Sequence, residues 1–167
     1  HARFHILSGM DYLNFETTGC DLSIGPRIKN RTDLFQSVVR HYKYGYYASD
    51  RYLQRYGKPE SLKDLKHHRF LALRDYNPLP DNLSKDRLIR IESTSYKPLV
   101  ELALRGVGII SLPINKTTYQ TNKLQRILPH VESESESLMM IYRKFNPKKD
   151  VIEQFAQLFN QIVNSEE

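Results

Sequence analysis

Strand signals and helix signals alternate along almost the whole sequence, and this alternation limits the fold more than any other feature. Segments with helical spacing lie between runs rich in β-branched, aromatic and other apolar residues. The runs typical of strands are residues 21–25, 69–73, 88–91, 107–112, 124–128 and 138–142, and residues 34–48 carry the pattern of two strands. Because the two kinds of element take turns, the sequence predicts an α/β fold with a mostly parallel or mixed sheet.

The helix that follows residue 49 has clear boundary signals. Ser49 is a good N-cap residue, and Tyr52 lies in the apolar stripe of the predicted helix. Gly57 stands at the usual C-terminal position, and Pro59 just beyond it cannot continue the helix. Residues 61–64 (SLKD) then have the spacing of a capping box.

Residues 90–113 form a helix-then-strand pattern. Either Ser93 or Thr94 is expected to cap the helix, and Gly106 is expected to end it in the left-handed conformation. Gly108 permits close packing where the strand begins. The glycines resemble a dinucleotide-binding fingerprint, but that motif needs a strand before the glycines and a helix after them, so we interpret both glycines as structural.

The C-terminal segment predicts an amphipathic helix. Ile152, Phe155, Phe159 and Ile162 lie on one helical face, so this helix is expected to dock against the rest of the domain. At the other end of the chain, residues 4–7 have the pattern of a strand.

The composition needs no disulfide and suits a reducing cytoplasm as well as any other compartment. The chain of 167 residues can bury a sizeable core, and Cys20 is its only cysteine. The formal net charge is +6, but Lys and Arg are scattered among acidic and apolar neighbours, which favours a solvated surface over a nucleic-acid face. The longest apolar runs fall far short of the roughly 20 residues that span a bilayer, so no contact with a membrane is expected.

The sequence carries no recognisable motif of an enzyme or of a metal site. It has neither a GxxxxGK[ST] phosphate loop nor a GxSxG nucleophile elbow, so we expect no catalytic residues and no cofactor. His67 and His68 are adjacent and therefore point apart, which favours a surface loop over a metal site. Solvation explains Glu132, Glu134 and Glu136 better than a bound cation does.

The basic and aromatic residues 40–47 (RHYKYGYY) leave a nucleic-acid alternative open. Aromatic and basic side chains on one strand can stack on single-stranded RNA. Lys43 lacks the glycine that follows the basic residue in RNP1 motifs, so tyrosine packing across strands is favoured over an RNA-binding module.

Several short motifs follow one another in a characteristic order along the sequence. They are DLSIG at residues 21–25, YASDRYL at 47–53, GKP at 57–59, LKDL at 62–65 followed by His67 or His68, LALRGVGIISLP at 102–113, and the strand at 124–129. This series resembles the DLAIR, AS..YL…G.P…L.DL..H, A..G.GI..LP and L..VLP segments of one family, the effector-binding domain of LysR-type transcriptional regulators. The resemblance covers nearly the whole chain.

The resemblance implies a two-lobed, periplasmic-binding-protein-like (type II) α/β fold with a small molecule in the cleft. Residues 1–46 plus 143–167 are expected to form lobe I, and residues 47–142 lobe II. Tyr47, Ala48 and Ser49 would form one crossing between lobes, and the strand that contains Tyr142 the other. The resemblance also implies that the winged helix-turn-helix domain and the first strand and helix of lobe I are missing.

The candidate effector contacts lie in two places. Ile24, Gly25 and Pro26 stand where a strand ends in a turn, and Gly25 replaces an Arg that the family often has. Ser93 and Thr94 stand at a predicted helix start, where free N–H groups and the helix dipole favour an anion. Their hydroxyls either cap the helix or contact the effector. Ile109 completes the set.

These expectations describe a cytoplasmic, non-enzymatic sensor that binds a small molecule, for which an organic anion is the candidate. The resemblance implies a homodimer, or a higher oligomer in the full-length regulator, with residues 4–7 and the helix after Thr94 as interface elements. DNA would be bound only by the missing domain. The alternative is a periplasmic-type solute-binding protein of the same fold, which an upstream signal peptide would indicate.

Overall fold

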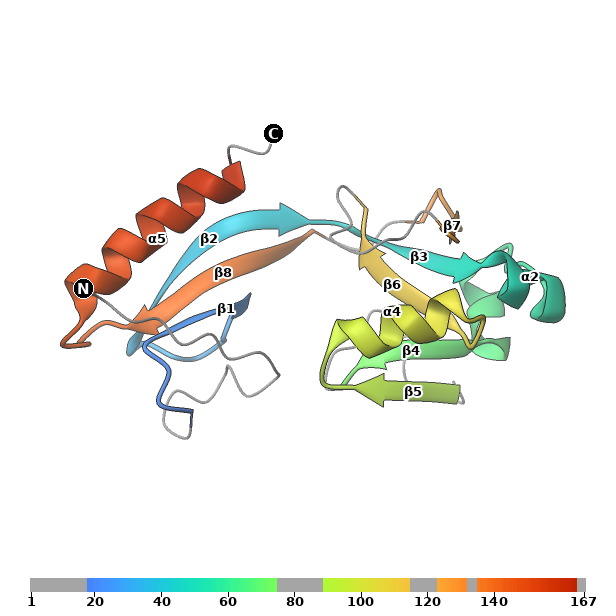
Figure 1. The fold of residues 1–167 in the computed structure, drawn as a ribbon, viewed down its shortest axis with the longest axis horizontal. Coiled ribbons are helices and arrows are strands. Elements are labelled where there is room, and N and C mark those ends of the chain that lie inside the picture. The colour runs from blue at the N-terminus through green and yellow to red at the C-terminus, as the bar shows by residue number, and fades with distance from the viewer. Residues whose placement is uncertain (1–17, 75–88, 115–122, 132–134, 165–167) are drawn as a thin grey trace. The chain divides into compact units, whose positions relative to one another are not determined.

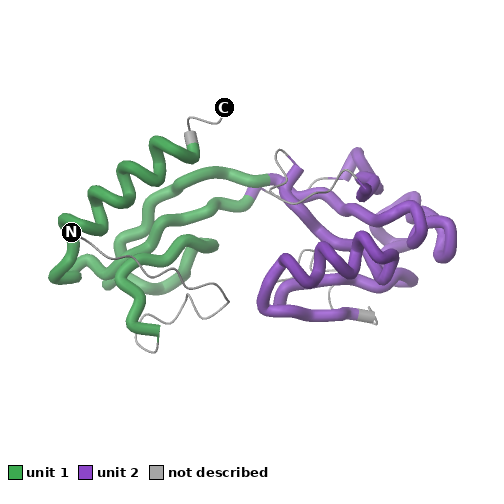
Figure 2. The backbone as a smooth tube through the Cα atoms, in the orientation of Figure 1, with its two compact units in different colours: residues 1–42, 136–167 green, residues 43–135 purple. Residues whose placement is uncertain are grey.

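The computed structural model describes residues 18–74, 89–114, 123–131 and 135–164. The chain divides into two compact units. Unit 1 contains His1–Tyr42 and Glu136–Glu167, and unit 2 contains Lys43–Ser135 (Figure 2). Each unit has its own sheet, and helices and strands mix within both (Figure 1), so the expected α/β class is confirmed.

Unit 1 is built on a three-stranded antiparallel sheet in the order β1-β8-β2. The strands are β1 (Leu22–Pro26), β2 (Leu34–Tyr42) and β8 (Glu136–Arg143). The central strand β8 is the most buried, since Met139, Met140 and Ile141 are fully enclosed. The predicted strands at 21–25 and 138–142 are confirmed, and β8 begins two residues earlier than expected.

The C-terminal helix α5 (Lys149–Asn164) belongs to unit 1 and is fixed to its sheet by polar contacts at both ends. The Tyr142 hydroxyl donates to the Glu153 carboxylate at 3.2 Å, and the Arg40 guanidinium donates to the Val163 carbonyl at 2.7 Å. Of the four residues predicted to share one docking face, Ile152 is buried, but Ile162 is 54% exposed. The helix therefore docks against the sheet of unit 1, as expected, and its apolar face is partly exposed at the C-terminal turn.

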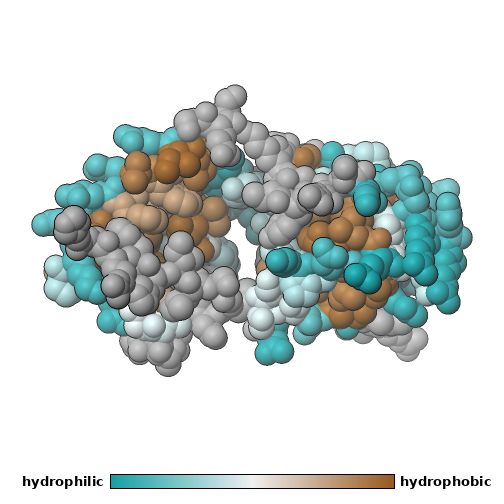
Figure 3. Space-filling view, viewed as in Figure 1, coloured by the Kyte–Doolittle hydropathy of each residue, from teal (hydrophilic) through white to brown (hydrophobic). Residues whose placement is uncertain are grey.

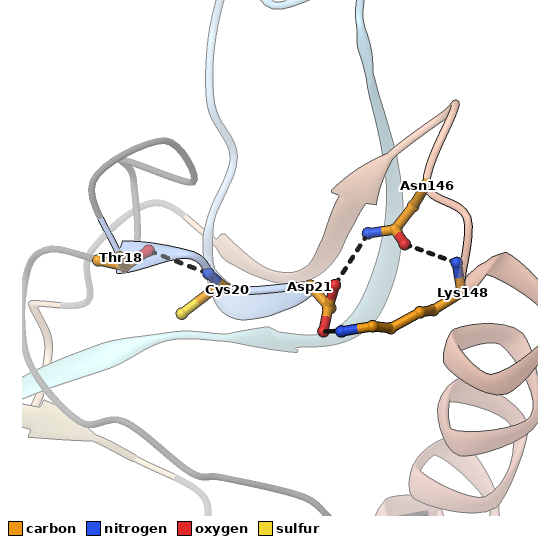
Figure 4. Close-up of polar contacts among 5 residues, drawn as sticks. All are labelled: Thr18, Cys20, Asp21, Asn146 and Lys148. Carbon is orange, nitrogen blue, oxygen red and sulfur yellow. Dashed lines mark hydrogen bonds and ion pairs between the residues drawn. The ribbon is translucent and has the colours of Figure 1, made fainter.

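A polar cluster ties the start of β1 to the loop before α5 (Figure 4). The Asp21 carboxylate accepts from the Lys148 ammonium at 2.7 Å and from the Asn146 amide at 3.3 Å. Asn146 in turn accepts from the backbone N–H of Lys148 at 2.8 Å. The hydrogen bond from Lys148 holds the pKa of Asp21 below its usual value. Two segments far apart in the sequence are thereby joined.

Unit 2 contains a five-stranded mixed sheet in the order β5-β4-β6-β3-β7. The strands are β3 (Tyr44–Ser49), β4 (Arg69–Leu73), β5 (Ile89–Ser93), β6 (Ile109–Pro113) and β7 (Leu124–Ile127). Strand β4 runs parallel to β5 and β6, and β3 runs antiparallel to β6 and β7. The helices are α2 (Asp50–Tyr56), the 3₁₀ helix η2 (Leu62–His67) and α4 (Tyr96–Leu104).

The sheet of unit 2 is packed on both faces, which its alternating side chains make possible. Ile109 belongs to a cluster with Tyr52 of α2 and Leu65 of η2. The next residue, Ile110, points to the opposite face and joins a cluster with Leu99 of α4. Helix α4 therefore covers one face, and α2 with η2 covers the other.

The local signals of unit 2 place its elements well. The Ser49 hydroxyl accepts from the Tyr52 backbone N–H at 3.4 Å, and Gly57 has φ of 82°, so both predicted ends of α2 are confirmed. The capping box at residues 61–64 is also present. Gly106 has φ of 78°, as expected for the end of a helix. A Cβ on Gly108 would lie 2.8 Å from the Arg69 carbonyl oxygen, so the predicted close approach is real.

The tyrosines of residues 40–47 do not form an open stacking platform. Tyr46 is 4% exposed and Tyr47 is 9% exposed. Burial raises the pKa of Tyr46 to about 12, and its ring meets Phe70 edge-on at 5.8 Å. These two rings serve the core, so the RNA-binding alternative loses its platform.

The two units differ from the predicted lobes at both boundaries. The chain passes between units at residues 42–43 and 135–136, whereas the sequence suggested 46–47 and 142–143. Strand β8 lies whole in unit 1 because it pairs with β1 and β2 along its length. Strand β3 lies whole in unit 2 because it pairs with β6 and β7. Within the described residues, no helix combines the length and apolar character needed to cross a membrane.

Candidate functional site

The carboxyl ends of the parallel strands β4 and β5 lie together at one end of the unit 2 sheet, which we call the carboxyl edge. Leu73 and Ser93 are paired in the last rung of these strands. The backbone N–H of Arg74 then donates to the Ser93 carbonyl at 2.9 Å. In open α/β sheets, ligands bind outside the carboxyl ends of the parallel strands, so this edge is a candidate ligand site.

Helix α4 begins at this edge, two residues later than the first predicted cap. Its N-cap is Ser95, whose side chain makes no capping hydrogen bond. The Ser93 hydroxyl instead accepts from the Ser95 backbone N–H at 3.2 Å. Thr94 is exposed, and its hydroxyl has no hydrogen-bond partner among the residues that the structure describes. The prediction that Ser93 or Thr94 caps α4 is therefore wrong.

The surroundings of the α4 start favour an anion. The first turn of α4 contains no acidic residue, and the positive end of the helix dipole lies there. Lys97 in this turn and Arg74 just beyond β4 are both exposed cations. Two hydroxyls, at Thr94 and Ser95, lie at the same turn. This is a set of donors and positive charges suited to a carboxylate.

Ile109 lies apart from this edge. It pairs with Phe70 at the start of β4, whereas Ser93 pairs with Leu73, three residues further along the same strand. At about 3.3 Å per residue, the two rungs are roughly 10 Å apart. The Ile109 side chain is also fully buried in the core. The structure does not bring Ile109 together with Ser93 and Thr94.

Ile24, Gly25 and Pro26 lie in unit 1, at the end of β1. Gly25 is buried opposite Met139, while Pro26 is exposed and ends the strand. The preceding Ser23 is 6% exposed, and its hydroxyl lacks a hydrogen-bond partner among the described residues. These residues and Ser93 with Thr94 belong to different units.

The predicted hinge residues lie inside strands. Tyr47, Ala48 and Ser49 are buried in β3, and Tyr142 is buried in β8. The chain crosses between units a few residues away, and the two crossing segments start from one rung of unit 1, where Tyr42 pairs with Glu136.

A buried polar network that the sequence did not indicate joins α2 to β4. Tyr52 is 1% exposed, and its hydroxyl accepts from the Arg69 backbone N–H at 2.9 Å. The same hydroxyl lies 3.1 Å from His68 Nδ1. Burial lowers the pKa of His68, so its neutral form is favoured. His68 is 7% exposed, so the prediction that both histidines lie in a surface loop is wrong for this residue.

The described residues contain no group of three or more His, Cys, Asp or Glu side chains arranged to hold a metal ion. A concave region with a volume of about 330 Å³ lies in unit 2 between the loop after α2 and the turn after β7. It is lined by Lys58, Pro59, Glu60, Leu128, Pro129 and His130. None of the predicted effector contacts lies in it.

Comparisons with known proteins agree on one family. The model of the LysR substrate binding domain matches residues 2–163. The regulatory domain of CrgA, a LysR-type transcriptional regulator from Neisseria meningitidis, is 19% identical, with a TM-score of 0.64 over 91% of this chain and 79% of that domain. The structure of CrgA itself gives a TM-score of 0.73 at 19% identity, over 96% of this chain and 58% of that one.

The effector domain of the transcriptional regulator AmpR of Pseudomonas aeruginosa is 14% identical, with a TM-score of 0.67 over 92% of this chain and 77% of that one. No curated protein sequence matches. The solved structures, at these identities, show the fold alone, which is the two-lobed, periplasmic-binding-protein-like fold of such regulatory domains. Since the family model covers almost all of the sequence, the chain belongs to the LysR substrate binding domain family.

Proposed function

We propose that this chain is the sensor of a cytoplasmic LysR-type transcriptional regulator and that its effector is a small organic anion. The carboxyl edge of β4 and β5 carries the proposal, because it combines a helix start, hydroxyl groups and cations in one place. Recognition of the operator sequence belongs to a separate domain of the regulator, and the sensor itself catalyses no reaction. The regulator acts as a homodimer or higher oligomer.

In this proposal Thr94 donates a hydrogen bond to a carboxylate oxygen of the effector. A hydrogen bond to a charged group contributes about 1.5–3 kcal/mol, which corresponds to roughly 10- to 150-fold in Kd. Lys97 and Arg74, both exposed, attract the anion without fixing its position. Ser93 has a different task, because its hydroxyl already accepts from the Ser95 N–H and so holds the turn that presents Thr94.

Ile24, Gly25 and Pro26 provide the second set of contacts in the proposal. Gly25 itself is buried opposite Met139, so the contacts would be made around it, and Pro26 ends β1 with an exposed apolar ring. Ile109 supports the site only from within the core, since its side chain is fully buried.

In this proposal effector binding favours one conformation of the regulator over another. The chain crosses between units at residues 42–43 and 135–136, so we place the hinge there and not within the β3 and β8 strands that contain Tyr47 to Ser49 and Tyr142. A change in the arrangement of the units would alter the geometry of the DNA-bound oligomer.

A thermal-shift screen of mono- and dicarboxylates, with neutral small molecules as a comparison set, tests the proposal on this chain. A ligand present at 100 times its Kd stabilises the folded protein by about 2.7 kcal/mol, so an effector raises Tm. Thr94→Ala should remove most of the shift, whereas Thr32→Ala, an exposed threonine of unit 1, should leave it unchanged. A full shift with Thr94→Ala excludes this residue from the site. The absence of any stabilising carboxylate, while neutral compounds stabilise, excludes the anion.

A further inference from the structure

The net positive charge of the protein is concentrated in one unit. Residues 43–135 contain 16 Lys and Arg against 10 Asp and Glu, while the remaining residues contain 9 of each. The whole formal charge of +6 is therefore that of unit 2. Charge that looks scattered along the sequence is thus unevenly distributed over the fold.

Within unit 2, the segment from α2 to the start of β4 presents a basic face. We use this name for Arg51, Arg55, Lys58, Lys63, Lys66 and Arg69. All are exposed except Arg69, which is half-buried. Figure 3 shows hydrophilic residues over the end of unit 2 where α2 lies.

The acidic residues of the same segment are mostly engaged elsewhere. Asp50 accepts a hydrogen bond from the side chain of Gln125, a residue of β7. Asp64 accepts from the backbone N–H groups of Glu60 and Ser61 in the capping box, at 3.1 Å and 2.8 Å. These carboxylates keep their charge, and together with Glu60 they leave the segment 50–69 with six cations against three anions.

Two guanidinium groups of the basic face are held over one aromatic ring. The Cζ atoms of Arg55 and Arg69 lie 5.4 Å and 5.3 Å from the centroid of the Tyr56 ring. Tyr56 is itself fixed against the buried ring of Tyr52, at 4.8 Å between centroids. Neither arginine forms an ion pair within the described part of the chain. Stacking on a ring restricts a guanidinium and leaves its N–H groups available to an oxyanion.

We propose that the basic face binds the phosphate backbone of double-stranded DNA, independently of sequence and of the effector site. An acidic protein surface would offer the same charge, but protein interfaces have an apolar centre. Tyr56 is the one large apolar side chain that is well exposed in the described residues of unit 2. A cationic surface whose one exposed apolar side chain, Tyr56, lies beneath two guanidinium groups matches the phosphate backbone, whose recognition is mostly electrostatic.

The DNA-binding proposal depends on the proposed function in one respect, which is that a LysR-type regulator is held close to DNA. A sensor with this face would lie against DNA that flanks the operator. Contacts with phosphates carry no sequence information, but they position a protein on the duplex. This role differs from that of the edge at Thr94, which takes a small anion.

Fluorescence anisotropy with a labelled duplex of arbitrary sequence tests the proposal on the chain as it stands. Binding should weaken steeply between about 50 mM and 200 mM salt. Each lost phosphate contact lowers the slope of log K against log salt by about 0.9. The double variant Arg55→Gln/Arg69→Gln should therefore lower the slope by about 2 and weaken binding in about 0.1 M salt by one to two orders of magnitude.

Arg27→Gln/Lys29→Gln is the matched control, because it removes the same charge from two exposed positions of unit 1. Far-UV circular dichroism confirms that each variant is folded, and Arg51→Gln/Lys58→Gln tests the same face if the first pair unfolds. Equal weakening by test and control pairs would show that only net charge matters and would overturn the proposal. Binding to polyglutamate as tight as to DNA, or no binding to DNA at low salt, would overturn it too. Carboxylate-induced thermal shifts are measured separately, so either proposal can fail alone.

Discussion

Tyr52→Phe is expected to destabilise unit 2 through the loss of a single oxygen atom. The Tyr52 hydroxyl accepts from the Arg69 backbone N–H at 2.9 Å and forms a second hydrogen bond with His68 Nδ1 at 3.1 Å, whose direction depends on the histidine tautomer. Tyr52 and His68 are 1% and 7% exposed, so water cannot easily replace the missing oxygen. The substitution therefore leaves the Arg69 backbone N–H and His68 Nδ1 without this partner.

An unsatisfied buried polar group costs about 1–3 kcal/mol, so the two together should cost about 2–6 kcal/mol. The ring remains, and with it the packing against Tyr56 at 4.8 Å, so the cost of a cavity is small. For a chain of this size Tm falls by about 2–4 °C for each kcal/mol lost. The expected decrease is then on the order of 10 °C.

Urea unfolding followed by far-UV circular dichroism measures the loss. Tyr56→Phe is the matched control, because Tyr56 is 37% exposed and its hydroxyl has no partner in the described chain. The free energy of unfolding should change by less than about 0.5 kcal/mol in this control. The reasoning is refuted if Tyr52→Phe and Tyr56→Phe have the same effect.

Two further predictions concern the same region. Burial lowers the pKa of His68, so the folded protein resists its protonation and the stabilisation present above pH 6.5 should be lost as the pH falls below that value. Urea midpoints measured between pH 7.5 and 5 should show this decline in the wild type, a smaller one in His68→Asn, and no reduction of it in the control His130→Asn, which changes an exposed histidine of unit 2. Gly108→Ala should cost about 1–3 kcal/mol, because its Cβ would lie 2.8 Å from the Arg69 carbonyl oxygen, and the same unfolding assay would contradict this if stability were unchanged.

The elements that the sequence predicted best are those with local causes. Ser49 and Gly57 fix the two ends of α2 through a hydrogen bond and a positive φ that involve only neighbouring residues. The capping box at residues 61–64 has the same local origin. Signals of this kind are complete within a few residues of sequence, so they need no knowledge of the fold.

The start of α4 was predicted less well because three candidate caps stand in a row. Ser93, Thr94 and Ser95 all favour an N-cap position. The choice among them depends on β4, which pairs with β5 as far as Ser93 and keeps this residue in the strand. The distant pairing partner thus moves the helix start to Ser95, and propensity alone cannot predict this.

The unit boundaries have the same nonlocal origin. Tyr42, Tyr44 and Tyr46 continue the period of two across Lys43, so the sequence gives no sign that the chain leaves one sheet and enters another. The change lies in the partners, since Tyr42 pairs with Glu136 and Tyr44 pairs with Pro113. Similarly, adjacent histidines give no signal as to which one is buried, because the Tyr52 hydroxyl that selects His68 lies 16 residues earlier.

The start of α4 at Ser95 also bears on the choice between the two roles that the sequence left open for the Ser93 and Thr94 hydroxyls, which are helix capping and contact with the effector. A threonine at the cap would use its hydroxyl on the helix N–H groups, and an effector would have to compete with the helix for it. With Ser95 at the cap and Ser93 bonded to the Ser95 N–H, neither role falls to Thr94. Its exposed hydroxyl has no hydrogen bond within the described chain to lose. An anion at Thr94 therefore gains a donor without costing the helix a cap, which makes Thr94 the sharper test of the effector site than Ser93.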